Sequence, residues 1–170
     1  LEKQITNPKY KGFRAAHRIA HPDEILNTLE TDQPYPLKMA WFYATNGIAN
    51  TTNAQGKRWY KALQKMEFNV VQDVFMTPTA MALADVFLPA CTYAERDGIR
   101  VGDGAQRGET INKVCQVGAC KSDMQINLEL GKRFNPEAWP WKDDKEMFSS
   151  VIACTGYTFE ELQQVAPAYI

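Results

Sequence analysis

The chain has 170 residues, a length that suggests one domain with a buried core. Its composition, 45% hydrophobic and 23% charged residues, is typical of a folded globular protein. Because 19 basic and 20 acidic residues leave a net charge of −1, the chain lacks the basic excess of nucleic-acid-binding proteins. No apolar run reaches the ~20 residues of a membrane span. We therefore expect neither nucleic acid as a partner nor direct membrane insertion.

The first third of the chain predicts an irregular lead-in over residues 1–20, then a helix and a strand. The helix should run over residues 22–30, since Pro22 suits its first turn and two acidic residues follow. Residues 37–44 form an apolar run of strand length that stops at the turn signal of residues 45–47. After a polar loop to about residue 54, the spacing of Trp59, Leu63 and Met66 predicts a second helix.

The middle of the chain continues this alternation of strands and helices. We expect strands at residues 68–71 and 86–89, with a helix of small residues at 79–86 between them. Residues 91–119 are rich in glycine and form a loop region in which short strands remain possible. Helices are predicted at 123–134, capped by Ser122, and at 143–153 and 158–165. The alternation predicts a single α/β domain over residues 1–170, Rossmann-like, with a mainly parallel sheet and helices on both faces.

Three groups of residues could in principle carry chemistry of their own. His17 and His21 have the i, i+4 spacing of helical metal ligands, but Pro22 opposes one helix through both, so solvated histidines are favoured. Cys115 and Cys120 lack the closer spacing of zinc or iron–sulfur ligands, which favours free thiols or small buried residues. Glu95 and Asp97 could act as a carboxylate pair, although mixed-charge runs are usually solvated or ion-paired.

Polar residues follow each of the three predicted strands. Asn46 comes after the first strand, Gln72 and Asp73 come after the second, and Thr92 comes soon after the third. Ligands of open parallel sheets bind outside the carboxyl ends of the strands, where such side chains can meet a base, a ribose or a phosphate. Thr77 could meet a phosphate at the start of the following helix. Spacing alone weighs capping and turn formation equally with this ligand-binding interpretation.

A series of motifs runs in a fixed order from Met39 to Gly98. These motifs are residues 44–47, Val71-Gln72-Asp73, Thr77 and Thr79, residues 82–86, Leu88-Pro89, and Glu95 with Gly98, followed later by Lys121-Ser122-Asp123. In order and spacing these stretches resemble the molybdopterin oxidoreductase family, the dimethyl sulfoxide reductase group. The resemblance extends over roughly residues 36–134.

The resemblance implies a Rossmann-like domain that holds one molybdopterin guanine dinucleotide, whose dithiolene binds molybdenum or tungsten. The residues that would contact this cofactor are Asn46, Gly47, Gln72, Asp73, Thr77, Arg96 and Asp123. Gln72 and Asp73 would meet the ribose or the guanine, and Asp123 would accept hydrogen bonds from the guanine edge. No catalytic residue and no metal ligand is expected in this chain, because the family's metal ligand belongs to an upstream region.

The resemblance also implies that the chain is one internal domain of a much longer catalytic subunit, inactive alone. Its expected partners are the remaining domains of that subunit and an iron–sulfur electron-transfer subunit, with an iron–sulfur cluster elsewhere in the full enzyme. Ala44 stands where the family has glycine and Gly47 where it has proline, which predicts a looser first turn. The alternatives are a stand-alone α/β nucleotide-binding or regulatory domain without catalysis, and a small hydrolase using Glu95 and Asp97.

Overall fold

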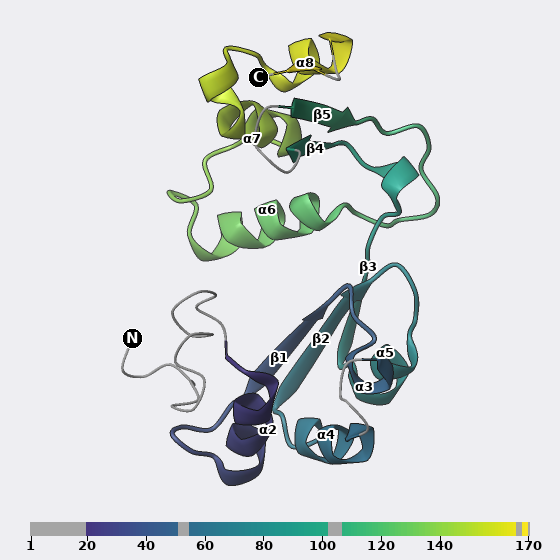
Figure 1. Ribbon diagram of the computed structural model, residues 1–170, viewed down its shortest axis with the longest axis vertical. Helices are drawn as coiled ribbons and strands as arrows, with labels where there is room; N and C mark the ends of the chain where they lie inside the picture. Colours follow the sequence, from purple (N-terminus) through teal and green to yellow (C-terminus); the bar gives the residue numbers. More distant parts are fainter. Residues whose placement is uncertain (1–19, 51–54, 102–106, 166–167, 170) are drawn as a thin grey trace. The chain divides into compact units, whose positions relative to one another are not determined.

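The structure, a computed structural model, describes residues 20–50, 55–101, 107–165 and 168–169 (Figure 1). The chain divides into two compact units, Leu1–Leu88 and Pro89–Ile170. Each unit has a hydrophobic core cluster of its own. The single domain expected over residues 1–170 stays a prediction, and the two units are described separately. His17 and nearly all of the predicted lead-in lie outside the described residues.

Unit 1 contains a three-stranded sheet in the order β1-β2-β3, formed by Met39–Tyr43, Phe68–Asp73 and Val86–Pro89. β1 and β2 are parallel, with Met39 opposite Phe68 and Tyr43 opposite Gln72. Parallel neighbours require crossover connections, which the intervening helices supply. This arrangement confirms the predicted α/β class with a parallel sheet and helices.

Among its described residues, unit 1 has the helices α2 (Pro22–Thr31), α3 (Gly47–Asn50), α4 (Gly56–Leu63) and α5 (Pro78–Leu83). α2 begins at Pro22, as predicted, and His21 caps it by accepting a hydrogen bond from the Asp23 N–H at 3.3 Å. α3 is a short helix inside the segment that was predicted to be a polar loop.

The core of unit 1 lies on one face of its sheet. The buried residues of this core are Leu26, Leu29, Ala62, Leu63 and Leu83, from α2, α4 and α5. They pack with Ala40 and Phe42 of β1, and each fully buried leucine contributes about 2 kcal/mol of burial free energy. Since side chains alternate along a strand, Met39, Trp41 and Tyr43 point to the other face, where all three are exposed.

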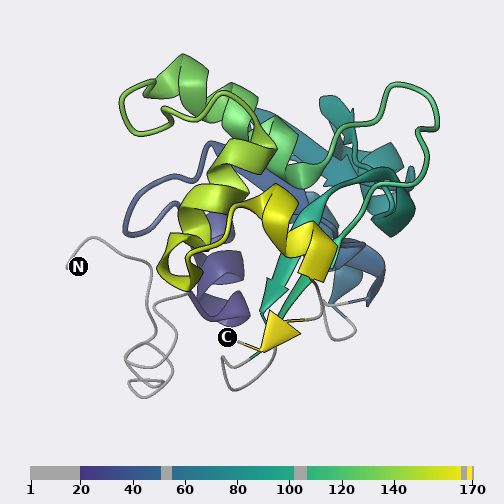
Figure 2. The ribbon, with the colours of Figure 1, turned by 90° about the horizontal axis from the view of Figure 1, so that it is seen from above.

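Unit 2 combines a small antiparallel sheet with helices (Figure 2). β4 (Gly98–Val101) pairs with β5 (Arg107–Ile111), and β5 also pairs with β6 (Ala168–Tyr169). α7 (Asp144–Val151) packs against β4 and against α6 (Asp123–Phe134), and α8 (Phe159–Val165) packs against β5. The described part of unit 2 also contains the short 3₁₀ helices η2 (Tyr93–Glu95) and η3 (Ala153–Thr155). β4 and β5 lie in the glycine-rich region 91–119, where short strands remained possible, whereas β6 lies outside it.

The core of unit 2 is built on an aromatic cluster. Met147, Phe148 and Phe159 are buried together, and the rings of the two phenylalanines lie 5.2 Å apart. Trp139 packs against this cluster and also covers Gly131 of α6, leaving no room for a Cβ there. The close approach of an indole to the helix backbone explains why glycine occupies the interior of α6.

α6 has the bounds that the sequence predicted. Ser122 accepts a hydrogen bond from the Gln125 N–H at 3.1 Å, and the Gln125 side chain accepts one from the Ser122 N–H at 3.1 Å. This reciprocal capping box satisfies two of the backbone donors that a helix start leaves unpaired. In the part of the chain that the structure describes, no helix has the length and apolar character needed to cross a membrane.

Candidate functional site

The carboxyl end of β1 leads into a tight turn at Ala44. The Ala44 N–H donates to the Gln72 carbonyl at 2.9 Å, so the turn is held to the end of β2. Ala44 has a φ of 47°, in the left-handed region that favours glycine. The glycine that the resemblance implies at this position would therefore have a backbone reason, and the alanine of this chain occupies a strained conformation.

Asn46 and Thr79 join the segment after β1 to the helix after β2. The Asn46 Oδ1 accepts hydrogen bonds from the Thr79 hydroxyl at 2.7 Å and from the Thr79 N–H at 3.3 Å. The same hydroxyl accepts a bond from the Ile48 N–H at 3.1 Å. Thr79 has no exposed surface, so these bonds are shielded from water. The structure thus brings Asn46 and its neighbour Gly47 together with the first turn of α5.

The other predicted contacts of unit 1 lie at or just after the end of β2. Asp73 is half-buried, and its Oδ1 accepts a hydrogen bond from the Phe75 N–H at 3.1 Å. Thr77 caps α5 by accepting a bond from the Ala80 N–H at 3.2 Å, which is the capping role that the sequence weighed against phosphate binding. Gln72 is 1% exposed, and its Oε1 accepts a bond from the Trp41 indole at 3.2 Å. Gln72 therefore ties β2 to β1 across the sheet.

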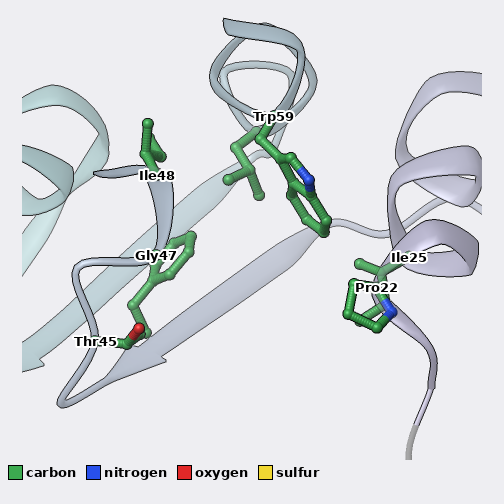
Figure 3. Close-up of a pocket in the computed structure, with 8 residues that line it drawn as sticks. Pro22, Ile25, Thr45, Gly47, Ile48 and Trp59 are labelled. Carbon is green, nitrogen blue, oxygen red and sulfur yellow. The ribbon is translucent and has the colours of Figure 1, made fainter. Parts of the chain in front are cut away.

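A cavity of about 210 Å³ opens beside the turn that follows β1 (Figure 3). Thr45 and Gly47 line it from the turn after β1, Ile25 lines it from α2, and Trp59 lines it from α4. Phe42 of β1 also contributes to its wall. Because most of the lining is apolar, the cavity suits a flat or apolar group and not a phosphate.

Arg96 and Asp123 belong to unit 2. The Arg96 guanidinium lies over the Tyr93 ring, 5.3 Å from its centre, in a cation–π contact. Asp123 is the first residue of α6, half-buried beside the capping box of Ser122. A carboxylate at this position is favoured by the positive end of the helix dipole. Arg96 and Asp123 therefore both have structural roles within unit 2.

Glu95 is buried, which the sequence did not indicate. Its carboxylate accepts hydrogen bonds from the Thr92 N–H at 2.9 Å, the Thr92 hydroxyl at 2.6 Å and the Val117 N–H at 2.9 Å. These donors, led by the Thr92 hydroxyl, lower the pKa of Glu95 to about 2. A carboxylate held ionised in this way is a poor proton donor, and its bonds show that it organises the loop after β3.

The neighbouring carboxylate, Asp97, is also engaged. Its Oδ1 accepts a hydrogen bond from the Lys113 N–H at 3.0 Å, and its Oδ2 lies 3.6 Å from the Lys145 ammonium. These partners, together with the low pKa of Glu95, argue against the acid–base pair of the hydrolase alternative. Within the described ranges, no three histidine, cysteine or acidic side chains gather in a way that could hold a metal ion.

Comparison with known proteins gives a consistent result. The model of the family described as molybdopterin oxidoreductase matches residues 14–133. Acetylene hydratase of Syntrophotalea acetylenica is 33% identical over 149 residues, which cover 86% of this chain and 20% of that protein. The alpha subunit of F420-dependent formate dehydrogenase of Methanocaldococcus jannaschii is 44% identical over 134 residues, covering 78% of this chain and 18% of the subunit.

A third relative and a solved structure agree with these matches. The molybdopterin-containing subunit of thiosulfate reductase of Salmonella typhimurium is 29% identical over 144 residues, covering 82% of this chain and 18% of that subunit. The structure of acetylene hydratase from Pelobacter acetylenicus superposes with a TM-score of 0.73 at 32% identity, covering 89% of this chain and 20% of that one. The chain therefore spans about a fifth of the length of the relatives it matches.

Proposed function

Since the chain belongs to the molybdopterin oxidoreductase family, we propose that it binds and orients one molybdopterin guanine dinucleotide in a molybdenum- or tungsten-dependent enzyme. The family implies a pterin cofactor carrying one of these metals. The finer assignment, to the guanine dinucleotide and to its nucleotide end, rests on the residues at the carboxyl ends of β1 and β2. When bound, the metal–dithiolene centre supplies two-electron redox chemistry, while the protein supplies binding and orientation.

The observation that carries the proposal is the hydrogen-bonded junction between Asn46 and Thr79. It fixes the segments that leave two neighbouring parallel strands, at the edge of the sheet where α/β proteins bind nucleotides. A rigid, buried junction reduces the ordering cost of binding because the contacting groups are already in place. Gly47 follows Asn46 directly and lines the cavity beside the turn, so a ligand can approach the backbone closely.

The donor and acceptor groups at this edge suit a guanosine. Asp73 is half-buried, and a carboxylate can accept hydrogen bonds from the guanine ring N–H and exocyclic amine, or from ribose hydroxyls. The Asn46 amide can donate to a ribose or carbonyl oxygen. Gln72 would act indirectly, by holding Trp41 and β1 in register with β2.

Arg96 and Asp123, both in unit 2, are also proposed as cofactor contacts. A guanidinium pairs well with a phosphate oxygen, and the Tyr93 ring below Arg96 restricts where its side chain can go. Asp123 offers a carboxylate to guanine donors, as Asp73 does. Thr77 caps α5 by accepting from the Ala80 N–H, and its hydroxyl proton stays available for the proposed phosphate contact.

The proposal also covers the part that this chain would play in the complete enzyme. We expect the chain alone to have no turnover, since no catalytic residue or metal ligand is assigned to it. The remaining domains of the same catalytic subunit would complete the cofactor pocket. An iron–sulfur electron-transfer subunit would be a further partner, and an iron–sulfur cluster would lie elsewhere in the complete enzyme.

Calorimetric titration of the purified chain with GDP, with ADP as the control ligand, tests the proposal in unit 1. We expect weak binding that prefers GDP and falls at least tenfold in Asp73→Ala. Glu67→Ala is the matched control, because this exposed carboxylate precedes β2 at the opposite end of the sheet and pairs with Lys38. Equal binding of GDP and ADP, or equal losses in the two variants, would contradict the proposal.

The same titration tests unit 2. Asp123→Ala should weaken GDP binding, whereas Glu129→Ala, on the same helix and paired with Lys121, should leave it unchanged. A loss in Asp73→Ala without one in Asp123→Ala would confine the nucleotide contact to unit 1. Unchanged binding in both aspartate variants would contradict the nucleotide contacts proposed for Asp73 and Asp123.

A further inference from the structure

Two thiols from distant parts of the sequence face each other in unit 2. The Sγ atoms of Cys91 and Cys120 lie 3.2 Å apart, although the residues are 29 positions apart in the chain. Cys91 follows β3 and Cys120 precedes α6. The spacing in the sequence paired Cys120 with Cys115. In the structure Cys115 is exposed, and its thiol donates to the Ala94 carbonyl.

The backbone on both sides of the pair is already joined. Ala90 and Lys121 form a parallel β-bridge, and the Cys91 N–H donates to the Lys121 carbonyl at 2.9 Å. The Lys121 N–H donates in turn to the Pro89 carbonyl at 3.3 Å. The two sulfurs are therefore held together by the fold of unit 2 and not by a chance contact of mobile side chains.

The surroundings of the two sulfurs differ. Cys91 is 5% exposed, whereas Cys120 is half-buried and reachable from solvent. The Cys120 thiol lies 3.2 Å from the Glu95 Oε1 and accepts a hydrogen bond from the Gln116 amide at 3.5 Å. Burial raises the pKa of the Cys91 thiol to about 12, so Cys91 is protonated at neutral pH. Cys120 is thus the sulfur that an outside reagent would meet first.

From this geometry we infer that Cys91 and Cys120 form a thiol–disulfide exchange site that accepts low-molecular-weight disulfides and closes to an intramolecular disulfide. A disulfide needs a sulfur–sulfur distance of about 2.05 Å, so the two atoms must approach by roughly 1 Å. Side-chain rotation supplies a movement of this size. The site is separate from the nucleotide contacts proposed above and does not depend on them.

The exchange balances in two steps. Cys120 loses its proton to solvent and attacks one sulfur of the small disulfide, forming a mixed disulfide and releasing one thiolate, which takes up a proton. Cys91 then loses its proton and attacks the Cys120 sulfur, forming the Cys91–Cys120 bond and releasing the second thiolate, which is also protonated. Two protein thiols are oxidised by two electrons, and the small disulfide is reduced to two thiols.

Closure would connect the exit of β3 to the start of α6 by a covalent bond. The bond would close the loop that contains Glu95, Arg96 and the β4–β5 pair. Because such a link restricts the unfolded chain, the oxidised form should melt at a higher temperature than the reduced form. Reduction by dithiothreitol should reverse the change.

The test uses the purified chain carrying Cys115→Ser and Cys154→Ser, which removes the two exposed thiols. After treatment with oxidised glutathione, we expect an intact mass lower by two hydrogens, no retained glutathione, and a non-reduced peptide that joins Cys91 to Cys120. Adding Cys91→Ser should instead leave a stable glutathione adduct on Cys120. Free thiols in the parent, or an adduct that is equally stable in both proteins, would overturn the inference.

A second variant tests whether geometry selects the pair. With Cys91→Ser and Cys154→Ser, the remaining thiols are Cys115 and Cys120, which are closer in sequence. We expect this variant to form the intramolecular disulfide at least tenfold more slowly than the Cys91–Cys120 protein. Equal rates would show that any two nearby cysteines suffice and would also overturn the inference. The upward shift in Tm should occur only in the Cys91–Cys120 protein.

Discussion

The side-chain oxygen of Asn46 and the hydroxyl of Thr79 lie 2.7 Å apart, in a hydrogen bond that joins the segment after β1 to the first turn of α5. Thr79 is fully buried and accepts a second bond from the Ile48 N–H. One hydroxyl therefore satisfies a side chain and a backbone donor at once. A buried polar group that loses its partner costs more than the bond itself contributed.

Replacing Thr79 by valine should destabilise the protein by about 1–3 kcal/mol, because the variant loses the buried hydroxyl that donates to the Asn46 Oδ1 and accepts from the Ile48 N–H. The free energy of unfolding from denaturant titration measures the loss. Thr79→Ser is the control, since it keeps the hydroxyl and removes only one methyl group, worth about 0.8 kcal/mol. A serine variant as unstable as the valine variant would show that packing and not hydrogen bonding holds the junction.

Ala44→Gly should stabilise the protein by about 0.5–1 kcal/mol. Ala44 has a φ of 47°, and the left-handed conformation costs a non-glycine residue about 1–2 kcal/mol. Glycine removes that cost and returns about 0.5–1 kcal/mol through the greater freedom of the unfolded chain. The same substitution at Ala40, inside β1, should destabilise. A destabilised Ala44→Gly variant in thermal melting would contradict the assignment of strain.

Gly131→Ala should destabilise the protein by about 1–3 kcal/mol, the usual cost of overpacking. A Cβ at position 131 would overlap the Trp139 ring, and this clash outweighs the gain of about 1 kcal/mol that alanine brings to a helix interior. The double variant Gly131→Ala, Trp139→Ala provides the check. The added cost of the Cβ should disappear there, and an undiminished cost would place its cause elsewhere.

Glu95 should make stability depend on pH in the acid range. Its pKa is about 2 in the folded protein against an ordinary value of 4.5, so the unfolded chain binds more protons between these values. The free energy of unfolding therefore rises with pH across this window, and the stabilisation is lost as pH falls from about 4.5 towards 2. Denaturant titrations from pH 2 to 5 should show a smaller slope in Glu95→Gln; an unchanged slope would exclude Glu95 as its source.

The elements that sequence could predict are those with local determinants. Pro22 and the acidic residues after it defined the start of α2, and Ser122 and Gln125 defined the start of α6. The apolar runs gave β1 and β3 to within two residues at each end. In each case the element is determined either by an interaction between residues that are close in sequence or by the burial of one run of apolar side chains.

What sequence missed depends on contacts between distant positions. Glu95 looked like part of a solvated run, yet it is buried because the Thr92 and Val117 donors satisfy it. Cys91 and Cys120 meet only because Ala90 pairs with Lys121. Neither pairing leaves a periodic signal in the chain. The predicted contacts Asn46, Gly47, Gln72, Asp73, Thr77, Arg96 and Asp123 remain predictions.

The direction of the Asn46 amide has a consequence for selectivity. With Oδ1 turned to Thr79, the amide nitrogen would be the atom that meets the proposed ligand, so position 46 would favour hydrogen-bond acceptors. An aspartate would accept from Thr79 equally well and retain the fold, but it would set a negative oxygen against a phosphate or carbonyl. Melting and nucleotide titration of Asn46→Asp should therefore diverge, with Tm kept and affinity lost. That outcome would show that folding and the proposed nucleotide contact are separable at a single atom of Asn46.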